Sequence, residues 1–240
     1  MVSRPADLQE TISPLTINMK NSKKTGVIFD CDGTLMRSLD LGMGSYNYAL
    51  EKLGERPREP DEIKKYFGAG ADRIFLQLLG DEKKALKAFD YYFEHESQQV
   101  SRIHLHQGIQ DLLEKLSAAG IPMGVVTGRH YRDLELMFTH HKLHDYFVTL
   151  ICDNHLPKSK PAPDGILMAA SRMGLDPQDT FYVGDSIMDL QAARAAGSRG
   201  IAALWDSWSK PLEMKLEEPV LMAHRPEEIW NFLNSSQVPS

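Results

Sequence analysis

Cysteine is scarce in this chain: two residues among 240 exclude a disulfide framework and a CxxC-type zinc site. No apolar run approaches the roughly 18 residues that a membrane-spanning helix needs. Positive charge is not in excess either, because the formal net charge is -6, and such a surface does not attract a nucleic-acid backbone. We therefore expect a cytoplasmic protein that binds neither membranes nor nucleic acids.

The length allows one substantial core with one smaller appended domain. Apolar residues at 42% and charged residues at 25% are typical of globular proteins. Residues 1–23 combine polar residues with prolines and lack the apolar core of a secretory signal, so we expect a flexible tail there. Nothing in the pattern distinguishes a monomer from a homodimer.

Short apolar runs alternate with helical patterns along most of the chain. The predicted strands are 27–30, 123–126, 181–183 and 199–204, and the predicted helices are 109–119, 164–173 and 226–233. Strands that alternate with helices predict an α/β protein with a Rossmann-like, doubly wound parallel sheet. We assign residues 24–38 and 108–240 to this core.

The segment 39–107 differs from the core because it holds helical patterns without a convincing strand. Those patterns cover residues 46–53, 71–79 and 83–99. We therefore expect residues 39–107 to form an inserted, all-helical cap domain. Since the insertion begins just beyond the first strand, it would lie over the carboxyl edge of the sheet as a lid.

Polar residues stand where three predicted strands end, which is the edge at which open parallel sheets bind ligands. Asp30 ends the first strand, Thr127 the second and Asp185 the third. We expect these side chains to meet in one crevice although they are far apart in the sequence.

The run from Asp30 to Thr34 places two carboxylates two residues apart where the chain leaves the sheet. A carboxylate can act as a covalent nucleophile in phosphoryl transfer, the role we expect for Asp30. Asp32 can then protonate the leaving alkoxide and later deprotonate water. Gly33 permits a tight turn that directs backbone N–H groups at a phosphate. An Asp-rich turn or helix cap is an equally good interpretation of this run by itself.

Asp185 and Asp189 are four residues apart, which places them on one face of a helix start. Mg²⁺ prefers oxygen ligands and often bridges carboxylates to a substrate phosphate. We expect Asp185 to be a direct magnesium ligand and Asp189 to support it. An aspartate at a helix start is, however, more often a cap than a ligand.

Two further groups suit a phosphate. Lys160 precedes Pro161 and a second proline, which restrict where the ammonium points, so it can hold a carboxylate nucleophile and the transferring phosphoryl group. Lys158 is an alternative for this role. Thr127, followed by Gly128, offers a hydroxyl to a phosphate oxygen.

Together these residues resemble the four motifs of the haloacid dehalogenase superfamily, in its phosphoglycolate-phosphatase-like branch with a helical C1-type cap. The first motif is similar to residues 30–35, the second to Thr127, the third to residues 160–164, and the fourth to residues 184–189. The resemblance implies magnesium-dependent hydrolysis of a small phosphate monoester through an aspartyl-phosphate intermediate.

The resemblance also assigns roles to single residues. They are Asp30 as nucleophile and magnesium ligand, Asp32 as acid/base and as a magnesium ligand through its carbonyl, Asp185 as magnesium ligand, and Thr127 and Lys160 as phosphate contacts. A true dehalogenase is disfavoured, because those relatives lack the second aspartate.

The chain departs from the family pattern at Arg37, where relatives often carry an acidic residue, and at Gly128, where many have Asn or Ser. A glycine-rich loop with Gly68 and Gly70, followed by Arg73, resembles the substrate-specificity loop of capped relatives. Arg73 would meet a substrate carboxylate or second phosphate through its fork of donors, or else be solvated.

Phosphonatase-like relatives carry a Schiff-base lysine near the position of Ala71, so that chemistry is disfavoured, although Lys64 and Lys65 lie close by. Two other functions remain open. One is a phosphomutase of the β-phosphoglucomutase type, and the other is a non-catalytic binding or regulatory protein on the same scaffold. The substrate is a small phosphorylated metabolite, and phosphoglycolate, pyrophosphate, sugar phosphates and nucleoside monophosphates all suit this level of inference.

Overall fold

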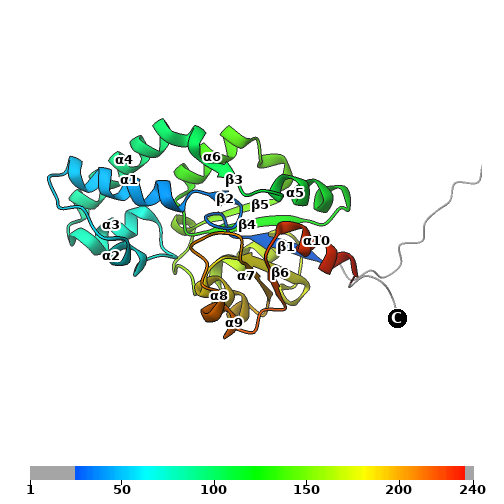
Figure 1. Cartoon of the computed structure of the whole chain (residues 1–240). Coiled ribbons are helices and arrows are strands. Elements are labelled where there is room, and N and C mark those ends of the chain that lie inside the picture. The colour runs from blue at the N-terminus through cyan, green and yellow to red at the C-terminus, as the bar shows by residue number, and fades with distance from the viewer. Residues whose placement is uncertain (1–24, 236–240) are drawn as a thin grey trace, which may run out of the picture.

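A six-stranded parallel sheet forms the centre of the molecule (Figure 1). The computed structural model describes residues 25–235, so the expected tail at residues 1–23 lies outside it. The strand order is β5-β4-β1-β6-β7-β8, and all neighbouring strands are parallel. The strands are β1 (Gly26–Phe29), β4 (Met123–Thr127), β5 (Thr149–Cys152), β6 (Thr180–Gly184), β7 (Arg199–Ala203) and β8 (Leu221–Ala223). The predicted doubly wound α/β core is confirmed.

Helices cover both faces of this sheet (Figure 1). One face carries α5 (Ile109–Ala118), α6 (Tyr131–His141) and α10 (Pro226–Ser235), and the other carries α7 (Asp164–Arg172) and α8 (Ile187–Ala196), with α9 (Pro211–Lys215) beside α8. Val27 and Phe29 belong to the apolar cluster of the first face and Ile28 to that of the second. Successive side chains of a strand point to opposite faces, which explains why β1 is apolar throughout.

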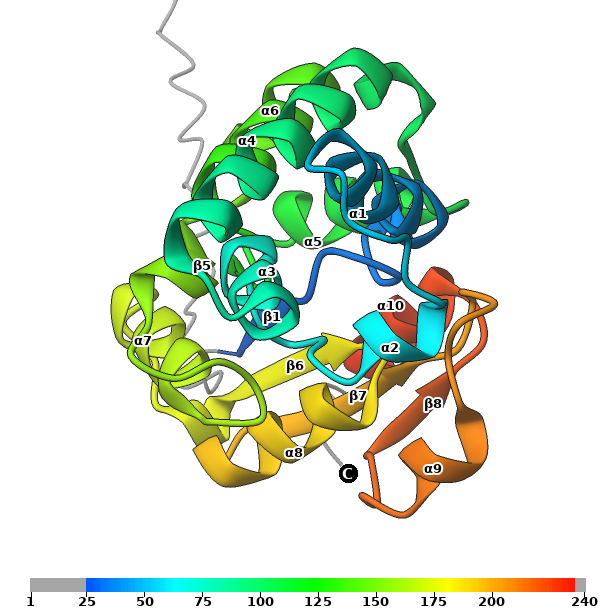
Figure 2. The same cartoon turned by 90° about the vertical axis from the view of Figure 1, so that its left-hand side faces the viewer.

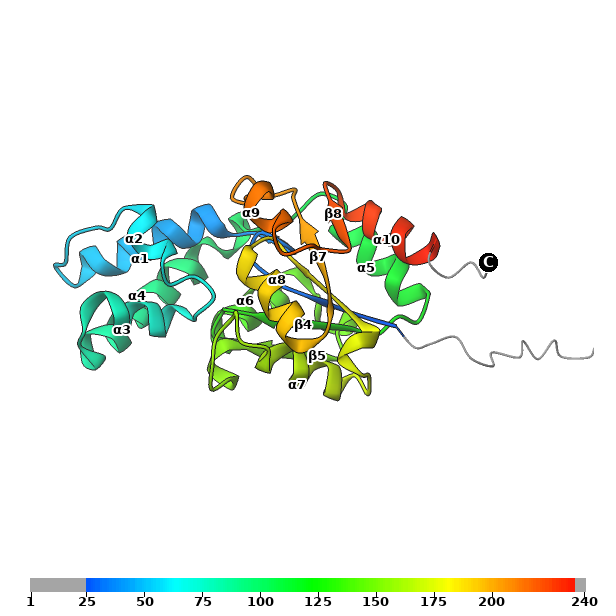
Figure 3. The ribbon, with the colours of Figure 1, turned by 90° about the horizontal axis from the view of Figure 1, so that it is seen from below.

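Four helices form an insertion at one end of the sheet (Figures 2 and 3). They are α1 (Leu39–Lys52), α2 (Pro60–Lys64), α3 (Ala71–Leu79) and α4 (Glu82–Gln99). The insertion has an apolar core of its own, in which the Tyr46 ring lies 5.2 Å from Phe75 and 4.9 Å from Tyr92, measured between centroids. Short 3-10 helices occur at Val100–Arg102, His144–Tyr146, Asp153–His155 and Pro177–Asp179.

A short antiparallel ribbon connects the insertion to the core. It pairs β2 (Met36–Arg37) with β3 (His104–Leu105). The expectation that residues 39–107 contain no strand is therefore wrong. A strand of two residues is too short to produce the alternation of apolar and polar side chains on which such an expectation depends.

Four elements of the core went unpredicted. They are the strands β5 and β8 and the helices α6 and α9. Both strands are short, and the buried face of α6 includes the acidic residue Asp133, which interrupts its apolar spacing. Within residues 25–235, no helix has both the length and the apolar character needed to cross a membrane.

Candidate active site

The carboxyl ends of neighbouring strands bring the predicted residues to one place. β1 lies between β4 and β6, so Asp30, Thr127 and Asp185 follow or end three adjacent strands. A cavity of about 320 Å³ lies between this edge of the sheet and the insertion. The core lines it with Asp30, Asp32, Gly128, Lys160, Asp185 and Asp189, and the insertion lines it with largely apolar residues such as Met43, Tyr46, Phe67 and Ile74.

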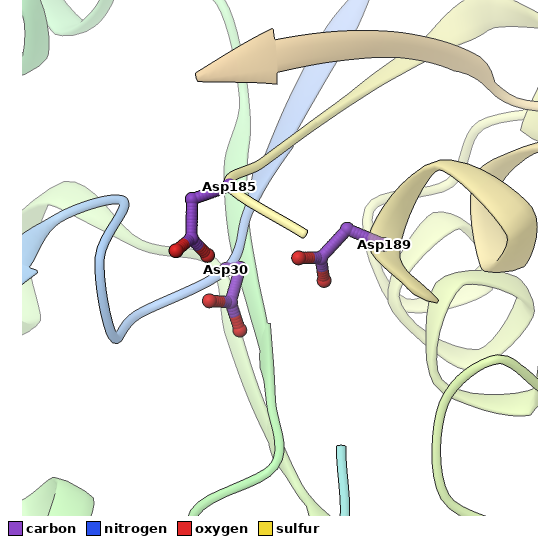
Figure 4. A group of neighbouring side chains, drawn as sticks. All are labelled: Asp30, Asp185 and Asp189. Carbon is purple, nitrogen blue, oxygen red and sulfur yellow. The ribbon is translucent and has the colours of Figure 1, made fainter. Parts of the chain in front are cut away.

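Three buried aspartates form a cluster in this cavity. One carboxylate oxygen each from Asp30, Asp185 and Asp189 lies within 4.8 Å of the others. Figure 4 shows Asp189 approaching Asp30 from the start of α8, while Asp185 lies beside Asp30 at the strand ends. The Nζ atom of Lys160 donates to Asp30 and to Asp189, both at 2.6 Å. The neighbouring Lys158 is exposed, so Lys160 occupies the position considered for either lysine.

The electrostatics of this cluster favour an additional cation. Burial raises the pKa of Asp30 to about 7 although Lys160 opposes the shift. Burial and then the charges of Asp189 and Asp30 raise the pKa of Asp185 well above its ordinary value. The cluster has three carboxylates and one ammonium, which contacts two of them, and oxygen donors of this kind are those that Mg²⁺ prefers. The residues present therefore fit a magnesium ion.

Asp189 has a structural role as well. Its carboxylate accepts hydrogen bonds from the backbone N–H of Ser186 at 3.1 Å and from the Ser186 hydroxyl at 2.5 Å, while the same hydroxyl caps the Asp189 N–H. This capping box begins α8. The start of the helix and the Lys160 contact thus depend on one side chain.

The carboxylate of Asp32 lies apart from the aspartate cluster. The Nε atom of Arg129 donates to both of its oxygens at 2.9 Å, and the Ser38 hydroxyl donates to it as well. Gly33 adopts φ +75°, and a Cβ at this position would lie 2.2 Å from the Asp185 carboxylate, so glycine is required. The Gly33 N–H donates to the Met36 carbonyl at 2.8 Å. The N–H of Gly33 itself is therefore used within the turn, and the expected tight turn is present.

Of the two phosphate contacts predicted at the end of β4, one lines the cavity and the other does not. Thr127 is buried, its hydroxyl accepts the Arg129 N–H at 3.1 Å, and it does not line the cavity. Gly128 does line it, and a Cβ there would lie 3.0 Å from the carbonyl oxygen of Gly68. Gly68 also lines the cavity and passes close to the Lys160 carbonyl, which its own Cβ would approach to 2.8 Å. Both glycines permit the insertion to approach the core.

Arg73 lies outside the cavity and joins the insertion to the core. Its guanidinium donates to the Leu156 carbonyl at 2.7 Å and to the Ser159 hydroxyl at 3.1 Å, and its Nε atom lies 3.2 Å from Asp153. The N–H of Gly70 donates to the same Asp153 carboxylate at 2.9 Å. The position of Arg73 therefore matches neither the expected substrate contact nor a solvated arginine.

Two buried residues of the site were not identified from the sequence. Arg129 bonds Asp32 on one side and Glu96 of α4 on the other, where its NH1 atom lies 2.5 Å from a Glu96 oxygen. Glu96 is fully buried and accepts the Tyr92 hydroxyl at 2.8 Å. An arginine directly after Gly128 was a detectable signal, whereas a glutamate in the polar part of a helix gives no sign of its burial.

A parallel α/β core with aspartates at its strand ends and helices above them defines a class of hydrolytic enzymes. A family model described as haloacid dehalogenase-like hydrolase matches residues 27–203, and the chain belongs to this family. It is an enzyme of the phosphatase type, a phosphoric monoester hydrolase.

Individual relatives agree with this assignment. A phosphoglycolate phosphatase of Nitrosococcus oceani is 28% identical over 88% of this chain and 96% of its own length. An N-acetylmuramic acid 6-phosphate phosphatase of Pseudomonas aeruginosa is 29% identical over 77% of this chain and 83% of its own length. A solved hydrolase from Pseudomonas syringae is similar in fold, with a TM-score of 0.77 at 21% identity over 88% of this chain and 98% of that one.

Proposed function

We propose that the protein hydrolyses a small phosphate monoester with Mg²⁺, through a phosphorylated Asp30. The observation that carries this proposal is the Lys160 ammonium held at 2.6 Å from Asp30 and from Asp189, beside Asp185, in the cavity between the sheet edge and the insertion. A carboxylate held by an ammonium in a pocket is oriented for attack on phosphorus.

The first step transfers the phosphoryl group to the enzyme. An Asp30 carboxylate oxygen attacks phosphorus, the bond from phosphorus to the ester oxygen breaks, and the leaving oxygen takes a proton from Asp32. Lys160 keeps Asp30 in place and stabilises negative charge on the transferring group. The products are the free alcohol and an aspartyl phosphate.

The second step returns Asp30 to its original state. A water molecule loses a proton to Asp32 and attacks phosphorus, and the bond from phosphorus to the Asp30 oxygen breaks. The sum of both steps is ester plus water giving alcohol plus inorganic phosphate. Asp32 lines the same cavity as Asp30, which supports its assignment to both proton transfers.

Magnesium would be held by Asp30 and Asp185, with Asp189 and the carbonyl of Asp32 in support. Bound there, it would neutralise the repulsion between the anionic nucleophile and the anionic substrate. The raised pKa values of Asp30 and Asp185 are the observation that supports this assignment.

The helical insertion would act as a cap, with residues 39–107 as the cap and residues 24–38 and 108–240 as the core. Its apolar residues line the outer part of the cavity, where the leaving group would lie. The volume of about 320 Å³ suits a small organic phosphate. The two cysteines are buried free thiols, which supports a cytoplasmic location.

A leaving group with a second anion would meet Lys64. Of the cationic residues that line the cavity, Arg129 and Lys160 are bound to buried carboxylates and Lys210 lies 3.1 Å from Glu213. Lys64 lies over the Trp208 ring at 4.1 Å, with Asp61 at 3.7 Å. Phosphoglycolate, on which the Nitrosococcus oceani relative is named to act, is therefore one candidate substrate.

The experiment is a phosphate-release screen with Mg²⁺ over phosphoglycolate, sugar phosphates, nucleoside monophosphates and pyrophosphate. Asp30→Asn should lose nearly all activity, whereas Asp111→Asn, an exposed aspartate on α5, should keep it. Turnover by Asp30→Asn at the native rate would refute the proposal. A phosphoenzyme that passes its phosphoryl group to a sugar phosphate instead of water would establish the mutase, and absence of turnover with every substrate would favour a binding protein.

A further inference from the structure

One buried guanidinium joins the acid/base residue to the helical insertion. Arg129 is 6% exposed and contacts Asp32, which is in the core, and Glu96, which is on α4. Its Nε and NH2 atoms face Asp32 at 2.8–2.9 Å, and NH1 faces Glu96 at 2.5 Å. Planar, forked donors of this kind can hold two carboxylates at once.

The two carboxylates are held differently. The Glu96 side chain is completely buried, and the Tyr92 hydroxyl fixes it at 2.8 Å. The Asp32 side chain is 22% exposed and lines the cavity. An uncompensated charge in a buried position costs several kcal/mol, so Arg129 must keep one partner at all times. Glu96 is the partner that stays, and Asp32 is the one with room to move.

We propose that Glu96 and Arg129 are positioning residues for Asp32. Glu96 compensates the positive charge of Arg129. The Asp32 carboxyl group can therefore leave the guanidinium and turn toward the ester oxygen. There Asp32 gives its proton to the leaving oxygen as the bond from phosphorus to that oxygen breaks. This inference rests on the proposed function.

The arrangement couples the insertion to the chemistry. Glu96 reaches Arg129 only when α4 lies against the loop that follows β4, where Arg129 stands. Asp32 can therefore leave Arg129 when the insertion is docked, whereas it must stay with Arg129 when Glu96 is withdrawn.

The test compares two esters that share a nitrophenyl ring. 4-Nitrobenzyl phosphate releases an alkoxide that needs a proton, whereas 4-nitrophenyl phosphate releases an acidic phenol that does not. In Glu96→Gln, Asp32 is the one anionic partner of Arg129 that remains. We expect kcat/KM for the benzyl ester to fall about tenfold and kcat/KM for the phenyl ester to change by less than about threefold, since general acid catalysis contributes on the order of a hundredfold or more.

The control and the second variants separate positioning from packing. Asp90→Asn breaks the exposed 2.9 Å ion pair between the same helix and Arg132 of α6, and should leave both esters unchanged. Glu96→Asp keeps the charge and should restore much of the benzyl ester rate. Tyr92→Phe removes the hydrogen bond to Glu96 and keeps the ring that lines the cavity. It should lower kcat/KM for the benzyl ester more than for the phenyl ester, by less than Glu96→Gln does, and it serves as the test if Glu96→Gln is poorly folded.

An equal fall for both esters in Glu96→Gln and in Tyr92→Phe would overturn the inference, because it would show a purely structural contact. Unchanged rates for both esters would overturn it too. Neither result affects the proposed function, which the phosphate-release screen and Asp30→Asn test separately.

Discussion

Replacing Lys160 by methionine tests the electrostatics of the aspartate cluster directly. The Lys160 ammonium is 8% exposed and lies 2.6 Å from Asp30 and from Asp189, which are 7% and 1% exposed. Burial opposes the charged lysine, but the two aspartates outweigh it, so the pKa of Lys160 stays well above its ordinary value. The variant would leave two buried carboxylates without their cation.

The expected loss follows from that geometry. Removing one partner of a buried ion pair destabilises a protein by about 3–5 kcal/mol, because the remaining charge is uncompensated. For a chain of this length, such a loss lowers Tm by on the order of 10 °C. In the proposed site Mg²⁺ would bind the same carboxylates in the folded state, so it should stabilise Lys160→Met more than the native protein.

Thermal and urea unfolding would be measured for both proteins with EDTA and with excess Mg²⁺. Lys158→Met is the matched control, because Lys158 is exposed two residues away, and it should change stability by less than about 0.5 kcal/mol. A loss below about 1 kcal/mol in Lys160→Met, or an equal loss in the control, would refute the reasoning.

Two other predictions concern Asp133 and Lys64. Burial, reinforced by the charge of Glu96, raises the pKa of Asp133 to about 8, so the folded protein keeps a proton that the unfolded chain releases near its ordinary pKa of 3.8. The free energy of unfolding of the native protein should therefore fall as pH rises between these two values. In urea unfolding, the stability of Asp133→Asn relative to the native protein should increase by up to a few kcal/mol from about pH 5 to about pH 9. A stability difference that does not change with pH would contradict this. Lys64→Met should lower kcat/KM for phosphoglycolate about tenfold and leave kcat/KM for 4-nitrophenyl phosphate unchanged. Lys65→Met, at an exposed neighbouring lysine, is the control. Equal effects on both substrates would show that Lys64 does not recognise a second anion.

Strand ends were the part of the site most accessible to prediction. The carboxyl ends of parallel strands meet at one edge, so Asp30 and Asp185 are brought together by topology, whatever their side chains do. Lys160 follows from a similar constraint, because the chain near it returns to the same edge before α7. The apolar runs predicted the core strands because Val27 and its neighbours are buried on both faces of the sheet.

Contacts across the insertion were not predictable in this way. Arg73 was expected either at the substrate or in solvent and instead binds Asp153, and nothing in the sequence indicated that the Asp32 side chain contacts Arg129. Glu96 lies 33 residues before Arg129 and belongs to another layer of the molecule. Such pairings depend on how two separately folded units dock, and a single sequence carries no local signal for them.

The ribbon of β2 and β3 determines how the insertion can be displaced. Both chain crossings run through these two adjacent strands, which are hydrogen-bonded to each other. A body tethered at two neighbouring points can swing about the line that joins them but cannot slide along the core. Opening would therefore be an angular motion about one axis, with the largest displacement at the far ends of α1 and α4 and the smallest beside Ser38.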